Sequence, residues 1–131
     1  MEFPLSEKPT RFGRLPDPKI PVILHTLQGL VRVNFLLDTG ADFTMLPKHL
    51  AAEMGIDLTH CPTDRSVGIE GRGIRVHLSP ITVNIGPHQL TLRCLFAERE
   101  GIPYILGRAD LFDHFSVTFD NRRKRIVLTR L

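Results

Sequence analysis

The stretch of this chain that carries the most chemical information reads Phe35-Leu36-Leu37-Asp38-Thr39-Gly40-Ala41-Asp42. An apolar run ends at Asp38, and a small hydroxyl residue and a glycine follow it. This order predicts a carboxylate at a strand end, on a tight turn where Gly40 allows another backbone to come close. For an Asp-x-Gly triplet alone, the commoner interpretation is a turn in which Asp38 merely accepts a hydrogen bond from its own backbone. The rest of the chain has to distinguish these two interpretations.

The segments on either side of this motif are predicted to be strands. Short apolar runs rich in Val, Ile, Leu and Phe, separated by Gly, Pro, Asn and Asp, are typical of an all-β domain. Two segments carry helix signals instead, namely 47–54, which Pro47 opens and Gly55 follows, and 109–114. Turn residues at 84–87 and 120–124 predict two hairpins. The predicted strands are 22–27, 30–37, 73–78, 81–85, 90–96, 115–119 and 125–131.

The length of the chain, 131 residues, leaves room for one core, because single domains commonly run about 100–150 residues. Five prolines within residues 1–21 block helices and remove sheet donors, so we expect an extended arm there and a single domain over 22–131. The composition, 42% hydrophobic and 24% charged, is that of a folded globular protein. The formal net charge of +3 is too small to name a partner.

Composition also limits the compartment and the cofactors. No apolar run approaches the roughly 20 residues that span a bilayer, and the N-terminus lacks the apolar core of a secretory signal, so we expect a cytoplasmic protein without membrane contact. Cys61 and Cys94 fit neither a disulfide scaffold nor a zinc motif; free thiols are the default interpretation, and a single bridge is the alternative. None of the six histidines stands at a recognised ligand spacing, so we assign no metal and no other cofactor.

A second motif lies far downstream, in Tyr104-Ile105-Leu106-Gly107-Arg108-Ala109-Asp110-Leu111-Phe112, where two apolar residues precede a glycine. The pair Leu-Leu-Asp-Thr-Gly-Ala-Asp and Ile-Leu-Gly-Arg, in this order and separation, resembles the retroviral-type aspartic peptidases, the retropepsins, and especially their bacterial single-domain relatives. The resemblance covers residues 22–131. It implies an all-β, single-domain retropepsin-like barrel with one short helix after the second motif.

The resemblance assigns catalysis to the first motif. Asp38 would be the catalytic carboxylate, Thr39 would join the two active-site loops of a dimer through hydrogen bonds, and Gly40 would bond the substrate backbone. Peptide hydrolysis by this route needs a general base and a general acid together, and two carboxylates about 3 Å apart, sharing one proton, supply both. Since no second Asp-Thr-Gly or Asp-Ser-Gly occurs in the chain, we expect the second aspartate from another copy, in a two-fold homodimer.

Substrate contacts are expected from three further places. Ala41 and Asp42 would line the groove, and Asp42 would form an ion pair with Arg108; two unrelated surface charges are the alternative. Residues 66–74 contain three glycines and fall where retropepsins carry a flap hairpin that closes over the peptide, whereas a plain exposed hairpin is the alternative. The flap residues expected at the peptide are Val67, Gly68, Ile69 and Gly71, and Ile102 and Ile105 are expected as pocket walls.

These features predict a homodimeric aspartic endopeptidase whose partners are a second copy and a peptide or protein substrate. A catalytically silent module of the same fold, which only binds peptides, is the first alternative, although such a module has little need of a water-activating aspartate. A basic nucleic-acid-binding β-barrel is the second, and it would use the basic cluster at 122–125. A solvated hairpin turn explains that cluster better, and few aromatic residues are available to stack on bases, so nucleic acid is not expected as a partner.

Overall fold

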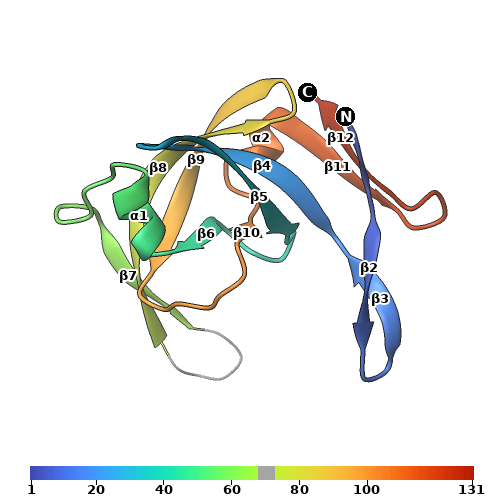
Figure 1. Ribbon diagram of the computed structural model, residues 1–131, viewed down its shortest axis with the longest axis horizontal. Coiled ribbons are helices and arrows are strands. Elements are labelled where there is room, and N and C mark those ends of the chain that lie inside the picture. Colours follow the sequence, from blue (N-terminus) through green and yellow to red (C-terminus); the bar gives the residue numbers. More distant parts are fainter. Residues whose placement is uncertain (68–72) are drawn as a thin grey trace.

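Strands dominate the computed structural model, which describes residues 1–67 and 73–131 (Figure 1). The predicted all-β fold is therefore confirmed. The large sheet contains β4 (Lys19–Thr26), β5 (Gly29–Leu37), β10 (Ile105–Leu106), β6 (Thr44–Pro47), β9 (His88–Ala97), β8 (Gly73–Ile85) and β7 (Thr63–Val67), in that order. A second sheet contains β1 (Glu2–Pro4), β12 (Arg125–Arg130) and β11 (Phe115–Asp120), and a separate hairpin contains β2 (Ser6–Thr10) and β3 (Gly13–Asp17). The helices are α1 (His49–Glu53) and α2 (Leu111–His114).

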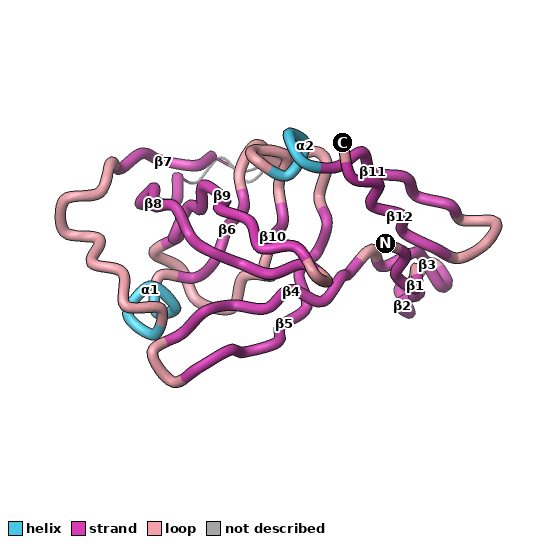
Figure 2. Tube along the Cα trace, turned by 90° about the horizontal axis from the view of Figure 1, so that it is seen from above, coloured by secondary structure: helices cyan, strands magenta, loops and turns pink. Residues whose placement is uncertain are grey.

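The large sheet curls until distant strands meet. In addition to its pairing with β5, β4 pairs with β8 through Ile23 with Asn84 and Leu24 with Val83. This contact between non-neighbouring strands gives the sheet its barrel-like shape. The second sheet and both chain termini lie together at one end of the molecule (Figures 1 and 2).

The core fills the inside of this curved sheet. Buried and more exposed positions alternate along β4 and β9, as expected for strands with one face toward a core. The apolar period of two that predicts strands in the sequence therefore also marks the inward face. The buried residues of these two strands include Ile20, Val22 and Leu24 in β4 and Leu90, Leu92, Cys94 and Phe96 in β9.

The two predicted strands 73–78 and 81–85 are one continuous strand, β8, so the predicted break between them is wrong. Pro80 lies inside this strand, opposite Arg93 of β9. The Leu78 amide donates to the Pro62 carbonyl on the edge of β8 away from β9, and an amide at position 80 would face the same edge. On this edge, β8 pairs with β7 through residues 73–77 and with β4 through residues 83–84. Proline is tolerated because no neighbouring strand needs an amide at this position.

The N-terminal 21 residues, expected as an extended arm, form strands in spite of their prolines. Glu2 to Pro4 pair with Val127 to Arg125 of β12, and Leu5 is buried in the core. The hairpin of β2 and β3 follows, and β4 begins at Lys19. The prolines are compatible with these strands because edge strands and two-stranded hairpins can spare some amide donors.

Both predicted helices are present and shorter than predicted. The helix expected over 47–54 is α1, and Pro47 ends β6 instead of opening the helix. The helix expected over 109–114 is α2. The predicted hairpins connect β8 to β9 and β11 to β12, and the basic cluster lies in the second turn. Among the described residues, no helix is long and apolar enough to cross a membrane.

Candidate active site

Asp38 lies directly after β5, at the point where the sheet ends in a turn. The last two residues of β5 pair in parallel with Ile105 and Leu106 of β10. The Asp38 amide donates to the Leu106 carbonyl at 3.0 Å, and the Asp38 carbonyl accepts from the Ala41 amide at 3.2 Å. The carboxylate therefore stands on a tight turn that is fixed to the sheet, at the strand end where the sequence predicts it.

The Asp38 carboxylate is partly exposed and has few partners. Its Oδ1 accepts a hydrogen bond from the Gly40 amide at 2.9 Å, which is the local bond that a plain turn would also make. Within residues 1–67 and 73–131, however, no lysine, arginine or histidine forms an ion pair with Asp38. A carboxylate without a cation is able to exchange a proton with water or a substrate. Thr39 and Gly40 beside it are exposed.

A groove of about 550 Å³ opens beside this carboxylate, and we call it the Asp38 groove. Its walls come from the large sheet, the second sheet and the segment that joins β3 to β4, so it lies where these parts of the chain meet. Apart from Asp38 and two uncharged polar residues, the lining is apolar. The lining residues are Leu5, Pro16, Pro18, Leu36, Leu37, Asp38, Thr39, Phe119 and Asn121.

A second cavity of about 520 Å³ adjoins the same loop at Asp42 and Phe43, and we call it the Asp42 cavity. Its opposite wall is formed by the residues that lead into and through β7, and its floor by apolar residues of β8 and β9. Asp42 is exposed and Ala41 is partly buried. The lining residues are Asp42, Phe43, Pro62, Thr63, Asp64, Arg65, Ser66, Val76, Leu78 and Leu95.

Arg108 holds the loop from the side of the second motif. Its Nη2 forms an ion pair with Asp42 Oδ1, which confirms the predicted pairing. Its Nη1 donates to the Thr39 carbonyl at 3.2 Å, and its backbone amide donates to the Ala41 carbonyl at 3.0 Å. The next amide, of Ala109, donates to the Asp42 carbonyl at 2.8 Å. Four polar contacts thus join the two motifs across more than 60 positions of sequence.

The close backbone approach in this site is at Gly107. A Cβ placed there would lie 2.4 Å from the carbonyl carbon and oxygen of Phe43, so no larger residue fits without moving the loop. A Cβ at Gly40 would meet only Asp38 Oδ1, at 3.2 Å. Within the described part of this chain, the close backbone approach is therefore made at Gly107, whereas the approach of another backbone to Gly40 stays a prediction.

The remaining predicted substrate residues are only partly described. Gly68, Ile69 and Gly71 lie outside the described residues, and Val67 ends β7, where its backbone pairs with Gly73 of β8. Ile105 lies in β10 between β5 and β6, paired with Leu36 and Met45. Ile102 lines a different cavity of about 300 Å³, together with Lys19, Asn34, Leu36, Pro103 and Tyr104. The prediction missed Phe43, Leu78 and Leu95 because nothing near them in sequence marks them as cavity residues.

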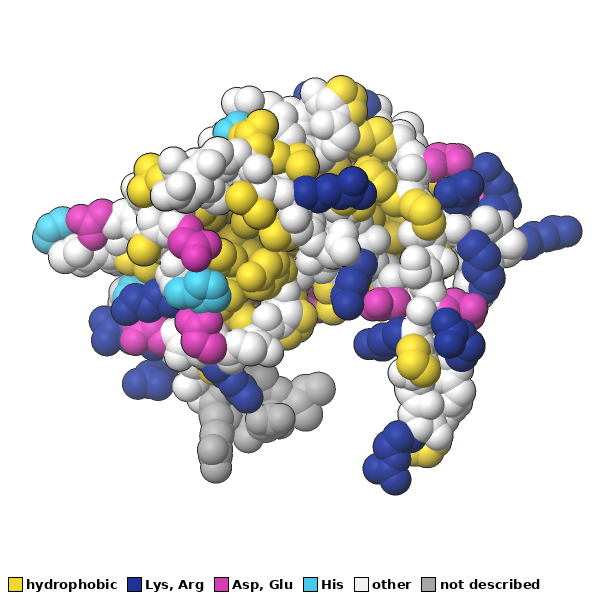
Figure 3. All heavy atoms as spheres, viewed as in Figure 1, with side chains coloured by type: hydrophobic (Ala, Val, Ile, Leu, Met, Phe, Trp, Pro, Cys, Tyr) yellow, Lys and Arg dark blue, Asp and Glu magenta, His cyan; other side chains and the backbone are white. Residues whose placement is uncertain are grey.

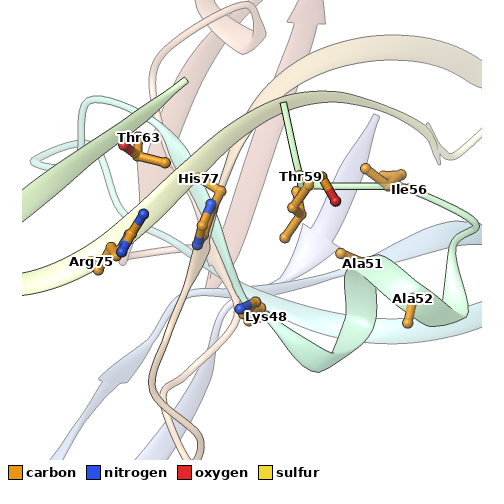
Figure 4. A pocket seen from close by; sticks show the side chains of 9 residues that line it. Lys48, Ala51, Ala52, Ile56, Thr59, Thr63, Arg75 and His77 are labelled. Carbon is orange, nitrogen blue, oxygen red and sulfur yellow. The ribbon is translucent and has the colours of Figure 1, made fainter. Parts of the chain in front are cut away.

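Another cavity, of about 330 Å³, lies between α1 and the first part of β8 and shares no lining residue with the Asp38 groove (Figure 4). Beside it, Glu98 accepts from His77 Nε2 at 2.6 Å and lies 3.3 Å from Arg75 Nε and 4.0 Å from Lys48 Nζ. The hydrogen bond from His77, aided by the nearby positive charges, lowers the pKa of Glu98. An acid whose pKa is lowered in this way is a poor base, so we do not place the catalytic site here.

The described residues offer few other groups that could bind a metal or act as a nucleophile. Across residues 1–67 and 73–131, no three or more His, Cys, Asp and Glu side chains gather as metal ligands would. Cys61 and Cys94 are both free thiols, so the default interpretation of the cysteines is confirmed. Burial raises the pKa of the Cys94 thiol, which makes it unreactive.

A nearly closed β-sheet that carries a strand-end Asp-Thr-Gly loop, braced by a Gly-Arg turn, is the arrangement of the retropepsin-like class of proteins. The fold is similar to a crystal structure of a retropepsin-like aspartic protease from Rickettsia conorii. The TM-score is 0.64, the alignment covers 96% of this chain and 97% of that chain, and the sequence identity is 21%. The predicted retropepsin-like fold is thus confirmed.

The family model named Aspartyl protease matches residues 23–109, which is more than half of the chain and contains both motifs. The chain therefore belongs to the aspartyl protease family, as the resemblance of its two motifs implies. A comparison with curated proteins finds no significant match.

Proposed function

We propose that this chain is a homodimeric aspartic endopeptidase in which the Asp38 carboxylates of two copies activate water. The proposal rests on the position and the surroundings of Asp38. It lies at a fixed strand end, lines a groove and, among the described residues, has no cationic partner. Membership of the aspartyl protease family supports the same conclusion.

The chemistry requires both carboxylates. When two of them lie about 3 Å apart they cannot both ionise, so one holds a proton while the other is free to accept one. The ionised carboxylate takes a proton from water as the water oxygen attacks the peptide carbonyl carbon, and the protonated carboxylate gives its proton to the carbonyl oxygen. The resulting diol collapses when the C–N bond breaks, the nitrogen gains a proton and a diol proton returns to a carboxylate.

The homodimer follows from the number of motifs. The chain has one Asp-Thr-Gly, and the partly exposed Asp38 and the exposed Thr39 and Gly40 form a surface that a second copy can approach. A two-fold axis beside this loop would bring the two carboxylates together, because a closed dimer places the same residues on both sides of its axis. Thr39 would then contact the partner loop, and Gly40 would offer its backbone to the substrate.

The peptide is proposed to bind in an extended form between the loop and the β7–β8 hairpin. Such sites hold a strand-like ligand through main-chain bonds and select side chains through alternating pockets. Ala41 and Asp42 would contact the peptide backbone, with Arg108 keeping Asp42 in place, and the Asp42 cavity would accept a side chain. From the hairpin, the contacts would come from Val67, Gly68, Ile69 and Gly71.

The test is incubation of the purified protein with a diverse peptide pool. The wild type should cleave internal peptide bonds, Asp38→Asn should not, and a statin-type transition-state mimic should inhibit the wild type. Cleavage that persists in Asp38→Asn would contradict the mechanism. Peptide binding without cleavage by a wild-type dimer would instead support the silent binding module.

A further inference from the structure

The hairpin of β2 and β3 stands apart from the rest of the molecule, and we propose that it is an arm that clasps the second copy of the chain in the dimer. The inference rests on the proposed function, since it takes the partner to be the copy that supplies the second Asp38. It adds an interaction surface, residues 6–17, which we call the hairpin arm.

Most of the hairpin arm is exposed. Among the described residues its two strands pair only with each other, and residues 6–9 and 11–16 are all exposed. Figure 1 shows it extending away from the body, and Figure 3 shows lysine and arginine side chains along it. It is nevertheless a regular hairpin with five paired positions, from Ser6 with Asp17 to Thr10 with Gly13.

A hairpin of this kind needs support. An isolated two-stranded hairpin is marginally stable in water, and this one has fewer amide donors because Pro9 and Pro16 lie in its strands. Its turn is fixed locally, since Thr10 Oγ1 donates to the Gly13 carbonyl at 2.6 Å and accepts from the Phe12 amide at 3.1 Å. A fixed turn on an uncovered pair of strands is expected where another surface completes the packing.

The tip of the hairpin arm has the composition of a contact surface. Phe12 is 93% exposed and Leu15 is 48% exposed, although water is an unfavourable environment for both. Arg11 directly precedes Phe12, and Arg14 follows it after Gly13. Aromatic residues and arginine are the types that most often carry binding energy in protein interfaces, so the tip fits a protein partner.

The place where the hairpin arm joins the body of the molecule indicates that the partner is a second copy of this chain. Pro16 of β3 and Pro18, directly after it, line the Asp38 groove together with Asp38 and Thr39. In the proposed dimer the partner surface begins at this groove, because the two carboxylates must approach to about 3 Å. A five-residue strand spans about 17 Å, so an arm that starts at this boundary is long enough to lie along the partner. Two-fold symmetry would place each arm on the other chain.

Sedimentation equilibrium of the full-length chain tests the arm. The double variant Phe12→Ala with Leu15→Ala should raise the dimer dissociation constant at least about tenfold, because the truncated side chains are the apolar part of the contact. The matched control is Leu27→Ala with Leu30→Ala, since these residues are also exposed, at 74% and 68%, but lie at the β4–β5 turn. The control should change the dissociation constant less than about twofold. At protein concentrations that saturate the dimer, the arm variant should regain the wild-type kcat.

Photo-crosslinking provides a readout that does not depend on variant stability. With a benzophenone amino acid in place of Phe12, irradiation should give a covalent dimer whose crosslinked peptide maps to the partner chain, as shown by mixing isotope-labelled and unlabelled protein. Crosslinks only within one chain, or an unchanged dissociation constant for the arm variant, would overturn the inference. An unchanged dissociation constant with a higher KM would overturn it too, and would make the arm a substrate contact.

The failure of the arm and the failure of the proposed function look different in these experiments. If the wild type dimerises through other residues, only the arm inference fails and the endopeptidase proposal stands. If the wild type dimerises through the arm but cleaves nothing, the endopeptidase proposal fails and the arm inference stands. A wild type that cleaves while strictly monomeric contradicts the dimeric mechanism, and the arm inference fails with it.

Discussion

Two carboxylates in this molecule stand directly after strands, Asp38 after β5 and Glu98 after β9, and their surroundings differ. Glu98 has His77 Nε2 at 2.6 Å, with two further cationic groups within 4.0 Å. Within residues 1–67 and 73–131, Asp38 Oδ1 accepts one hydrogen bond, from the Gly40 amide at 2.9 Å. Both acids lie near cavities, so a cavity by itself does not identify an active site in this fold.

The difference supports the proposal that Asp38, and not Glu98, is the catalytic acid. The bonds of Glu98 are already made within its own chain, and its lowered pKa shows that protonation would break a favourable arrangement. Asp38 is held through its backbone, and within the described residues its carboxylate forms no ion pair. A group that transfers protons needs a fixed backbone and a side chain that is not held in an ion pair.

The largest expected effect is on activity, from removing the charge of each acid in turn. Asp38→Asn should reduce kcat/KM for peptide cleavage by at least about 10³-fold, because both the acid and the base of the reaction are lost. Glu98→Gln should keep kcat/KM within about threefold, because Glu98 takes no part in the chemistry. Steady-state cleavage of one fluorogenic peptide measures both, and sedimentation of Asp38→Asn checks that it still dimerises. Equal losses in the two variants would contradict the distinction between the two acids.

The next effect concerns how the Asp38 loop is held. Gly107→Ala should lower the free energy of unfolding by about 2–3 kcal/mol, because its Cβ would lie 2.4 Å from the Phe43 backbone, which cannot yield as a flexible side chain could. Gly40→Ala is the matched change in the other motif, and it should cost less, since its Cβ would meet only the Asp38 carboxylate at 3.2 Å. Urea unfolding of both variants gives the two free energies. If Gly40→Ala proves the more destabilising, packing at Gly107 is not what positions the loop.

A smaller effect is expected from removing an arginine beside each acid. Arg108→Gln should lower kcat/KM about tenfold, because the Thr39 and Asp42 contacts that orient the loop are lost. Its cost in stability should stay below about 1 kcal/mol, because the ion pair is exposed. Arg75→Gln, beside Glu98, should leave kcat/KM unchanged. The same peptide assay and thermal unfolding measure both variants, and wild-type activity in a folded, dimeric Arg108→Gln would rule out an orienting role.

The sequence predicts those features of the site that are encoded locally or by a pair of motifs. The apolar run before Asp38 and the turn after it have a recognisable pattern, so the strand end could be predicted. The Asp42–Arg108 ion pair could be predicted because the two motifs together resemble the retropepsins. The strands β6 and β10 could not, because four and two residues are too few to show a period. They exist because β5 and β9 provide edges to pair with.

Other long-range side-chain contacts could not be predicted from the sequence. Asp110 has a φ of 67°, and its carboxylate accepts from the Arg93 amide at 2.6 Å. No local pattern indicates that an acid at the start of a short helix will accept a hydrogen bond from the backbone of β9. The hairpin arm is a similar case, since its prolines predict an irregular extended segment and only its pairing, Ser6 with Asp17 through Thr10 with Gly13, makes it regular.

The smallest expected effect is the pH dependence of stability that Glu98 contributes. Its pKa in the folded chain is below the ordinary value of 4.5, so its ionised form stabilises the fold fully above that value. This contribution should be lost as the pH falls from about 4.5 through the lower folded pKa. Thermal unfolding of the wild type and Glu98→Gln should therefore differ at pH 7 and converge in acid. A difference in melting temperature that stays constant down to the acid limit would show that His77 and its neighbours do not hold Glu98 ionised.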